Sequence, residues 1–177
     1  METTNKAHLF VVLRALDRLA ELLQNSYMPP APDVVKFIDD LWSSLADNAI
    51  KVKLGPVNKA LTRSIVDEQD ASYEELLRNM YLYAIADLVE FVKEGQPASL
   101  DAVENCIVDL YDYIACQKYL SEIKGGAAVI LTPDDEAKIS ADPDYREGLA
   151  RISADKNIAQ TISDWDAVLS HRHQPKR

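Results

Sequence analysis

The sequence predicts an all-α fold, a single-domain helical bundle of six or seven helices with a central antiparallel pair. Along most of the chain, apolar residues recur at the three- and four-residue spacing of amphipathic helices. Glycine is scarce, with five in 177 residues, which argues against many tight β-turns. Between Ser72 and Ile123, two long helical segments are joined by a short Gly-Gln-Pro turn. Helices joined by so short a turn lie antiparallel.

Three helices are predicted before residue 67. The first runs from about Asn5 to Gln24, and its polar side carries Arg14, Asp17, Arg18 and Glu21. Pro32 starts the second helix, because proline is favoured at the first helical position. This helix ends near Asp47, and a shorter third helix is predicted from about Val57 to Val66.

The central pair has clear helix boundaries in the sequence. Ser72 precedes Glu75 by three residues, the spacing of a reciprocal capping box. This fourth helix is predicted to run to Glu94, where Gly95 ends it. Ser99 is predicted to cap the fifth helix, which ends before Gly125-Gly126.

Two further helix starts follow, each with a capping residue, a proline and then acidic residues. They predict a short sixth helix over Pro133–Ser140 and a long last helix from about Pro143 to Ser170. We assign residues 1–170 to one helical domain and residues 171–177 to a polar C-terminal tail.

The composition excludes several classes of partner and site. The formal net charge is −10, from 29 acidic and 19 basic residues. We therefore expect no nucleic acid and no anionic membrane as a partner, since both attract basic surfaces. No stretch approaches the length of a membrane span, and no signal-peptide layout is present.

Cys106 and Cys116 lie ten residues apart on one predicted helix, too far for a disulfide. Free thiols indicate a reducing compartment, so we expect a cytoplasmic protein.

The sequence shows no catalytic constellation. Histidine occurs only at His8, His171 and His173, and neither a Glu-x-x-His pair nor a Cys-x-x-Cys motif is present. The glycines Gly125-Gly126 lack the rest of a phosphate-binding loop. We therefore predict no catalytic residue, no metal ligand and no cofactor. A protein that is not an enzyme is favoured, and an enzyme stays open as the alternative.

Three residues are candidates for an interface or a pocket: Asp87, Tyr83 and Tyr113. A helical wheel places Asp87 at the edge of the apolar stripe of its helix, where a carboxylate is half-buried. Tyr83 and Tyr113 are predicted on outer helix faces, and tyrosine is enriched at protein interfaces.

Four segments also carry a resemblance to a known family. They are Phe37-Ile38-Asp39-Asp40-Leu41-Trp42, Tyr83-Ala84-Ile85-Ala86-Asp87-Leu88, the Leu100–Ala115 helix, and Thr132-Pro133 with Asp142-Pro143 before a long final helix. Their order resembles that of the YjaG-like bacterial proteins, an uncharacterised all-helical family. The proline-rich connector Pro29–Pro32 departs from that pattern. The resemblance implies a helical fold, and no activity or catalytic residue comes with it.

Two functional hypotheses follow. The first is a bacterial protein-binding module, for example of the immunity type, that attracts a basic protein to an acidic helical face. The second is a small-molecule-binding protein or an enzyme with an interhelical pocket near Asp87. The simplest alternative for the acidity is solubility. The sequence leaves open whether the chain forms a homo-oligomer.

Overall fold

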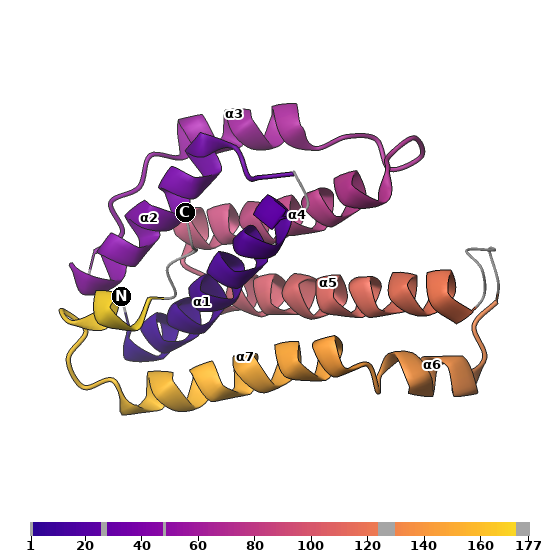
Figure 1. Ribbon diagram of the computed structural model, residues 1–177. Coiled ribbons are helices and arrows are strands. Elements are labelled where there is room, and N and C mark those ends of the chain that lie inside the picture. Colours follow the sequence, from indigo (N-terminus) through magenta and orange to yellow (C-terminus); the bar gives the residue numbers. More distant parts are fainter. Residues whose placement is uncertain (1, 26–27, 48, 124–129, 173–177) are drawn as a thin grey trace.

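The structure, a computed structural model, describes residues 2–25, 28–47, 49–123 and 130–172. Within these residues the chain forms helices and no strand (Figure 1). The elements are α1 (Thr3–Asn25), α2 (Pro32–Ala46), α3 (Leu54–Ser64), α4 (Tyr73–Glu94), α5 (Pro97–Ile123), α6 (Pro133–Ile139), α7 (Pro143–Thr161) and the 3₁₀ helix η1 (Val168–His171). The predicted all-α fold class is confirmed.

Helix α1 occupies the centre of the molecule. It contacts α2, α4, α5 and α7, and Figure 1 shows it crossing in front of α4 and α5. The five consecutive residues Leu9–Leu13 are therefore all buried, with exposed fractions of 3% or less. The same surroundings bury Asp17, which is only 3% exposed although it lies on the predicted polar side of this helix.

The central antiparallel pair is α4 and α5, which lie side by side (Figure 1). The capping box forms as predicted: the backbone N–H of Ser72 donates to Glu75, and the N–H of Glu75 donates to the Ser72 hydroxyl. Gly95 follows α4 with a φ of 69°, a left-handed conformation that glycine adopts without strain. Leu88 of α4 and Ile107 of α5 are both buried.

Two helix starts lie earlier in the chain than predicted. Helix α5 begins at Pro97 and not after Ser99, so proline again takes the first turn of a helix. Helix α3 begins at Leu54, because Gly55 and Pro56 are accommodated in its first turn, where no intrahelical N–H bond is required.

The last long helix is shorter than predicted. Helix α7 ends at Thr161, nine residues before the predicted Ser170. The Asp164 carboxylate accepts the backbone N–H of Asp166 at 3.0 Å, a local bond that competes with helix formation. Trp165 and Val168 still pack against the core, but they do so from a turn and from η1.

The predicted polar tail begins later than expected. The His171 carbonyl accepts from Arg14, and the Arg172 side chain bonds to Asp17, so both residues are attached to α1. Residues 173–177 and the predicted helix stop at Gly125-Gly126 lie outside the described residues.

Candidate functional site

The structure places the three predicted site residues on the α4–α5 pair, where each has a different neighbour. The half-buried Asp87 accepts from the thiol of Cys106, with 3.5 Å between sulfur and oxygen. The Tyr83 hydroxyl donates to Glu68 at 2.8 Å. These two residues lie one turn apart on α4, so they share a helix face.

Tyr113 belongs to the same region of the pair. Its ring stacks on Tyr73 of α4, with 5.8 Å between ring centroids and 26° between ring planes. It follows Cys106 by seven residues, the spacing of two helical turns. The three predicted residues therefore lie along one surface of α4 and α5, but they do not converge on one point.

Acidic residues follow this surface along α5. Asp101, Asp109 and Asp112 are exposed. Together with the neutral and exposed Asn105 they recur every three or four residues, so the four side chains form a polar stripe on the helix. Between residues 72 and 123 the sequence has ten acidic and three basic side chains. This segment thus carries most of the net charge of −10.

The three basic residues of the α4–α5 pair contact groups other than the carboxylates at positions 87, 109 and 112. Lys93 pairs with Glu90, Lys118 pairs with Asp142 and Asp144 of the α7 start, and Arg78 donates to the sulfur of Met28. Among the residues that the structure describes, no lysine or arginine lies within ion-pair distance of the carboxylates at positions 87, 109 and 112. We call the surface formed by Asp87, Asp109, Asp112, Tyr73, Tyr83 and Tyr113 the acidic face.

Burial, together with the neighbouring carboxylates of the acidic face, determines the state of the two thiols. Burial raises the pKa of Cys106 to about 11, and the neighbouring Asp87 and Asp109 carboxylates add to this rise. Burial and Asp112 raise the pKa of Cys116 in the same direction. Because the thiolate is the reactive form, neither cysteine is activated as a nucleophile at neutral pH.

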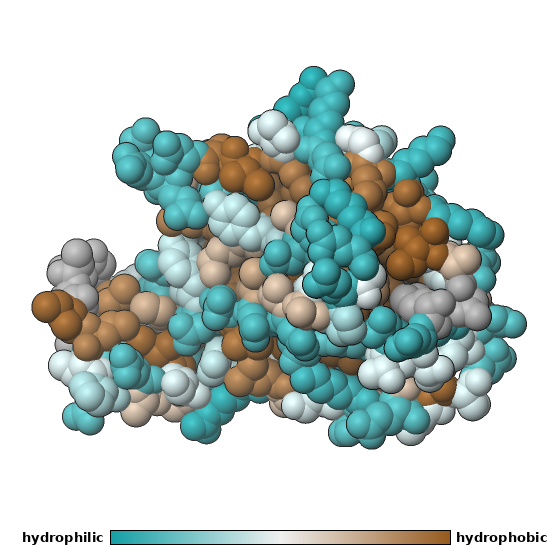
Figure 2. Space-filling view, turned by 180° about the vertical axis from the view of Figure 1, so that it is seen from behind, coloured by the Kyte–Doolittle hydropathy of each residue, from teal (hydrophilic) through white to brown (hydrophobic). Residues whose placement is uncertain are grey.

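Figure 2 shows the molecule from behind, the side on which α4 and α5 are no longer covered by α1. Hydrophilic side chains project from this side, and apolar and intermediate residues lie between them. A polar rim around apolar residues is a usual arrangement of a protein interface.

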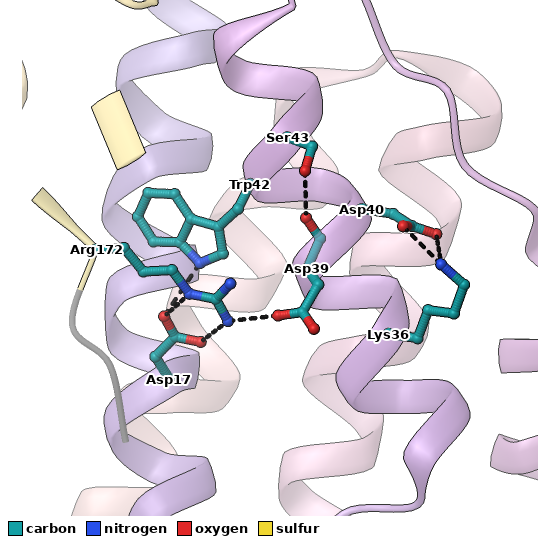
Figure 3. A network of polar contacts seen from close by, with 7 residues as sticks. All are labelled: Asp17, Lys36, Asp39, Asp40, Trp42, Ser43 and Arg172. Carbon is teal, nitrogen blue, oxygen red and sulfur yellow. Dashed lines mark hydrogen bonds and ion pairs between the residues drawn. The ribbon is translucent and has the colours of Figure 1, made fainter. Parts of the chain in front are cut away.

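A second polar cluster lies between α1 and α2 (Figure 3). The side chain of Asp17 is 4% exposed and accepts from the indole N–H of Trp42 at 3.1 Å. Arg172 donates to both of its oxygens, at 3.0 and 3.2 Å, and pairs with Asp39 at 2.7 Å. Burial raises the pKa of the Asp17 carboxyl, and the hydrogen bonds from Arg172 and Trp42 oppose that rise.

Another buried carboxylate joins α1 to α7. Asp155 is 3% exposed in its side chain and pairs with Arg14 and Arg18, each at 2.7 Å. Buried carboxylates are stabilised by such pairing. Three charged residues of α1 are thus paired inside the protein: Arg14 and Arg18 with Asp155 of α7, and Asp17 with Arg172.

A cleft of about 360 Å³ opens between α1, α5 and α7. Its apolar floor includes Val11 and Ala159, and its walls carry His8, Glu104 and Lys156. Glu104 lies 3.3 Å from Nε2 of His8 and pairs with Lys156. Asp87, Tyr83 and Tyr113 do not line this cleft.

Among the described residues, no group of three or more histidine, cysteine, aspartate or glutamate side chains is arranged to hold a metal ion. No helix in the described part of the chain combines the length and the apolar character needed to cross a membrane.

Comparisons of the chain with protein-family models, with curated proteins and with solved structures find no match. The resemblance to the YjaG-like family therefore stays a prediction. Any functional proposal has to rest on the geometry of the acidic face, the α1–α2 cluster and the cleft.

Proposed function

We propose that this protein is a binding module that recognises a basic protein through the acidic face of α4 and α5. One observation carries the proposal: the carboxylates of Asp87, Asp109 and Asp112 have no cationic partner among the described residues and lie beside three tyrosines. Unpaired carboxylates on one surface produce a negative field that attracts a basic partner and speeds association. An immunity-type protein, which neutralises the basic surface of a toxin, is one form of such a module.

The dimensions of the face suit a protein interface. Helix α4 has 22 residues, which corresponds to a length of about 33 Å. Two helices lying side by side about 10 Å apart present roughly 650 Å², close to the ~800 Å² that each partner contributes to a stable complex. The tyrosines add contact area at a low cost in conformational entropy.

We also propose that the complex forms in the cytoplasm of a bacterium. Both cysteines are free thiols on the same helix, and free thiols are typical of a reducing compartment.

Site-specific photo-crosslinking tests this proposal. A crosslinking amino acid replaces Asn105, which lies exposed beside Asp109, and in a matched control it replaces the exposed Asn157 on α7. We expect a basic protein to be captured from Asn105 and not from Asn157. Equal capture from both positions would contradict a specific acidic face.

Charge reversal then measures the electrostatic contribution with the captured partner. The double variant Asp109→Lys, Asp112→Lys should associate at least about tenfold more slowly at low salt. Raising the ionic strength should slow the wild type and leave this variant less affected. The control variant Glu136→Lys, Asp166→Lys makes the same charge change at exposed sites on other elements. If both double variants associate at the same rate, the acidic face is not the binding surface.

The cleft between α1, α5 and α7 supports a second candidate function, the binding of a small molecule. Its volume of about 360 Å³ falls in the range of known ligand pockets, and its walls carry charges of both signs. A screen of small metabolites by thermal shift tests this candidate. Stabilisation that is lost in Glu104→Gln, but retained in the Asp109→Lys, Asp112→Lys variant, would favour the cleft over the acidic face.

A further inference from the structure

The guanidinium group of Arg172 is held on three sides by residues of α1 and α2. Its Nε and Nη2 atoms donate to the two oxygens of Asp17, and Nη2 also pairs with Asp39. Its central carbon lies 5.7 Å from the ring centroid of Trp42. This combination of a forked ion pair and an aromatic face is specific for guanidinium, since an ammonium group has no planar fork.

Two of the groups that hold this guanidinium, Asp17 and Trp42, also have contacts that do not involve Arg172. The Trp42 indole donates to Asp17 at 3.1 Å, and the rings of Phe10 and Trp42 form a T-shaped pair with 5.8 Å between centroids. In α2, the Ser43 hydroxyl donates to the backbone carbonyl of Asp39 at 3.1 Å (Figure 3). Contacts within α1 and α2 therefore position Asp17, Trp42 and the backbone of Asp39 without the Arg172 side chain.

Arg172 lies on the side of the site that is open to solvent. It follows η1 in an extended conformation, with φ of −65° and ψ of 129°. Its side chain is 19% exposed, and that of Asp39 is 51% exposed, so the Asp39 side of the site is open to solvent. Buried Val168 anchors η1 to the core without the help of the Arg172 side chain.

We propose that Asp17, Asp39 and Trp42 form a binding site for a guanidinium group, which Arg172 fills in cis and which accepts a guanidinium from another molecule when Arg172 is withdrawn. An arginine side chain of a second protein carries this chemistry. The site lies between α1 and α2, and it does not depend on the function proposed for the acidic face.

Chemical rescue tests the site directly. In Arg172→Ala, the Tm should fall, because Asp17 loses its counterion while it stays buried. Ethylguanidinium should then reverse at least about half of this decrease in Tm, and the effect should saturate as its concentration rises. The probe is kept below about 50 mM, because guanidinium salts denature proteins at molar concentration. Ethylammonium has the same charge but lacks the planar set of N–H donors, so it should raise the Tm of Arg172→Ala much less.

Three controls make the result specific. Arg151→Ala removes an arginine from an exposed pair with Glu147, and its Tm should not respond to ethylguanidinium. The double variant Asp17→Asn, Arg172→Ala lacks the buried carboxylate and should not respond either. Wild type should not respond, because Arg172 occupies the site.

A second probe tests recognition of arginine itself. N-acetyl-arginine amide should stabilise Arg172→Ala more than N-acetyl-lysine amide does. If Arg172→Ala does not fold alone, the readout is recovery of helical circular dichroism on addition of ethylguanidinium, and absence of recovery overturns the proposal. Equal rescue by ethylguanidinium and ethylammonium, or rescue of the double variant, also overturns it.

Discussion

The carboxylate of Asp17 in α1 is bonded by both of its oxygens to Arg172, although 155 residues separate the two in the chain. Arg172 directly follows η1, and the indole of Trp42 shares the same carboxylate. This pair neutralises a charge that the central position of α1 buries, and its contribution to stability is measurable.

Replacing Arg172 with alanine should destabilise the protein more at neutral pH than in acid. The ordinary pKa of the Asp17 carboxyl is 3.8 and burial raises it in the folded protein; loss of Arg172 raises it further. A raised carboxyl pKa means that the folded state holds the proton more tightly, so stability present below pH 3.8 is lost as the pH rises through the folded pKa. We expect a loss of about 3 kcal/mol at pH 7 and a smaller loss at pH 4.

Urea unfolding of wild type and Arg172→Ala at both pH values measures this difference. Arg151→Ala serves as the control, since its pair with Glu147 is exposed and contributes little. A penalty for Arg172→Ala that is the same at pH 4 and pH 7 would show that Asp17 is not the group through which Arg172 acts.

Replacing Leu88 or Ile107 with alanine should destabilise the α4–α5 pair. Both side chains are buried, with exposed fractions of 0% and 1%, so each change removes apolar contacts and leaves a cavity. We expect each substitution to lower the free energy of unfolding by about 2–5 kcal/mol. The matched control is Val35→Ala at a position that is 40% exposed, for which about 0.5 kcal/mol or less is expected. Denaturant melts compare the three variants, and a loss below about 1 kcal/mol at Leu88 would contradict its burial.

The reactivity of Cys106 should depend on Asp87. With a pKa of about 11, Cys106 should be alkylated slowly at pH 8, and the rate should rise about tenfold for each pH unit below that pKa. Asp87→Asn removes the adjacent negative charge and should therefore speed alkylation at pH 8. The rate is measured by mass spectrometry in a Cys116→Ser background, so that one thiol reacts.

A distant charge change provides the control for this reaction. Glu122→Gln lies exposed near the end of α5 and should leave the alkylation rate of Cys106 unchanged. If Asp87→Asn also leaves it unchanged, the contact between Asp87 and Cys106 does not influence the thiol.

Any side chain at position 148 should force apart α5 and α7. A Cβ atom added to Gly148 would lie 2.9 to 3.0 Å from the ring atoms of Tyr111, which is closer than van der Waals contact allows. We expect Gly148→Ala to cost about 1–3 kcal/mol, reduced by the better helix propensity of alanine. Combining it with Tyr111→Leu should recover part of this loss. A double-mutant cycle measures the coupling, and a coupling of zero would contradict the close packing.

The helices could be predicted from the sequence wherever a local signal determined them. Both ends of α4 were predicted to within one residue, from the capping box at Ser72 and Glu75 and from Gly95. Such signals are readable because capping depends on neighbours in the chain. The end of α7 could not be predicted in this way. Trp165 and Val168 continue the apolar spacing of a helix, but they reach the core from a turn and from η1, and spacing alone does not distinguish these geometries.

The candidate sites were predictable to a smaller extent. The exposure of Asp109 and the half-buried position of Asp87 follow from the helical wheel of their own helices. Asp17, Trp42 and Arg172 were not recognised as a site, because their contact depends on how α1, α2 and η1 pack. One signal was present: Arg14, Asp17 and Arg18 interrupt a helix whose apolar residues are found on nearly every side, which indicates buried charges that need partners.

The pairing of Asp17 with Arg172 also sets an order of events during synthesis on the ribosome. Arg172 is added 155 residues after Asp17, which takes roughly 8–30 s at ~5–20 residues per second. Throughout that interval the nascent chain holds the α1 carboxylate without its guanidinium, so Asp17 gains its counterion only late in translation. A chain released before codon 172 would contain every long helix, but it would lack the guanidinium that neutralises Asp17.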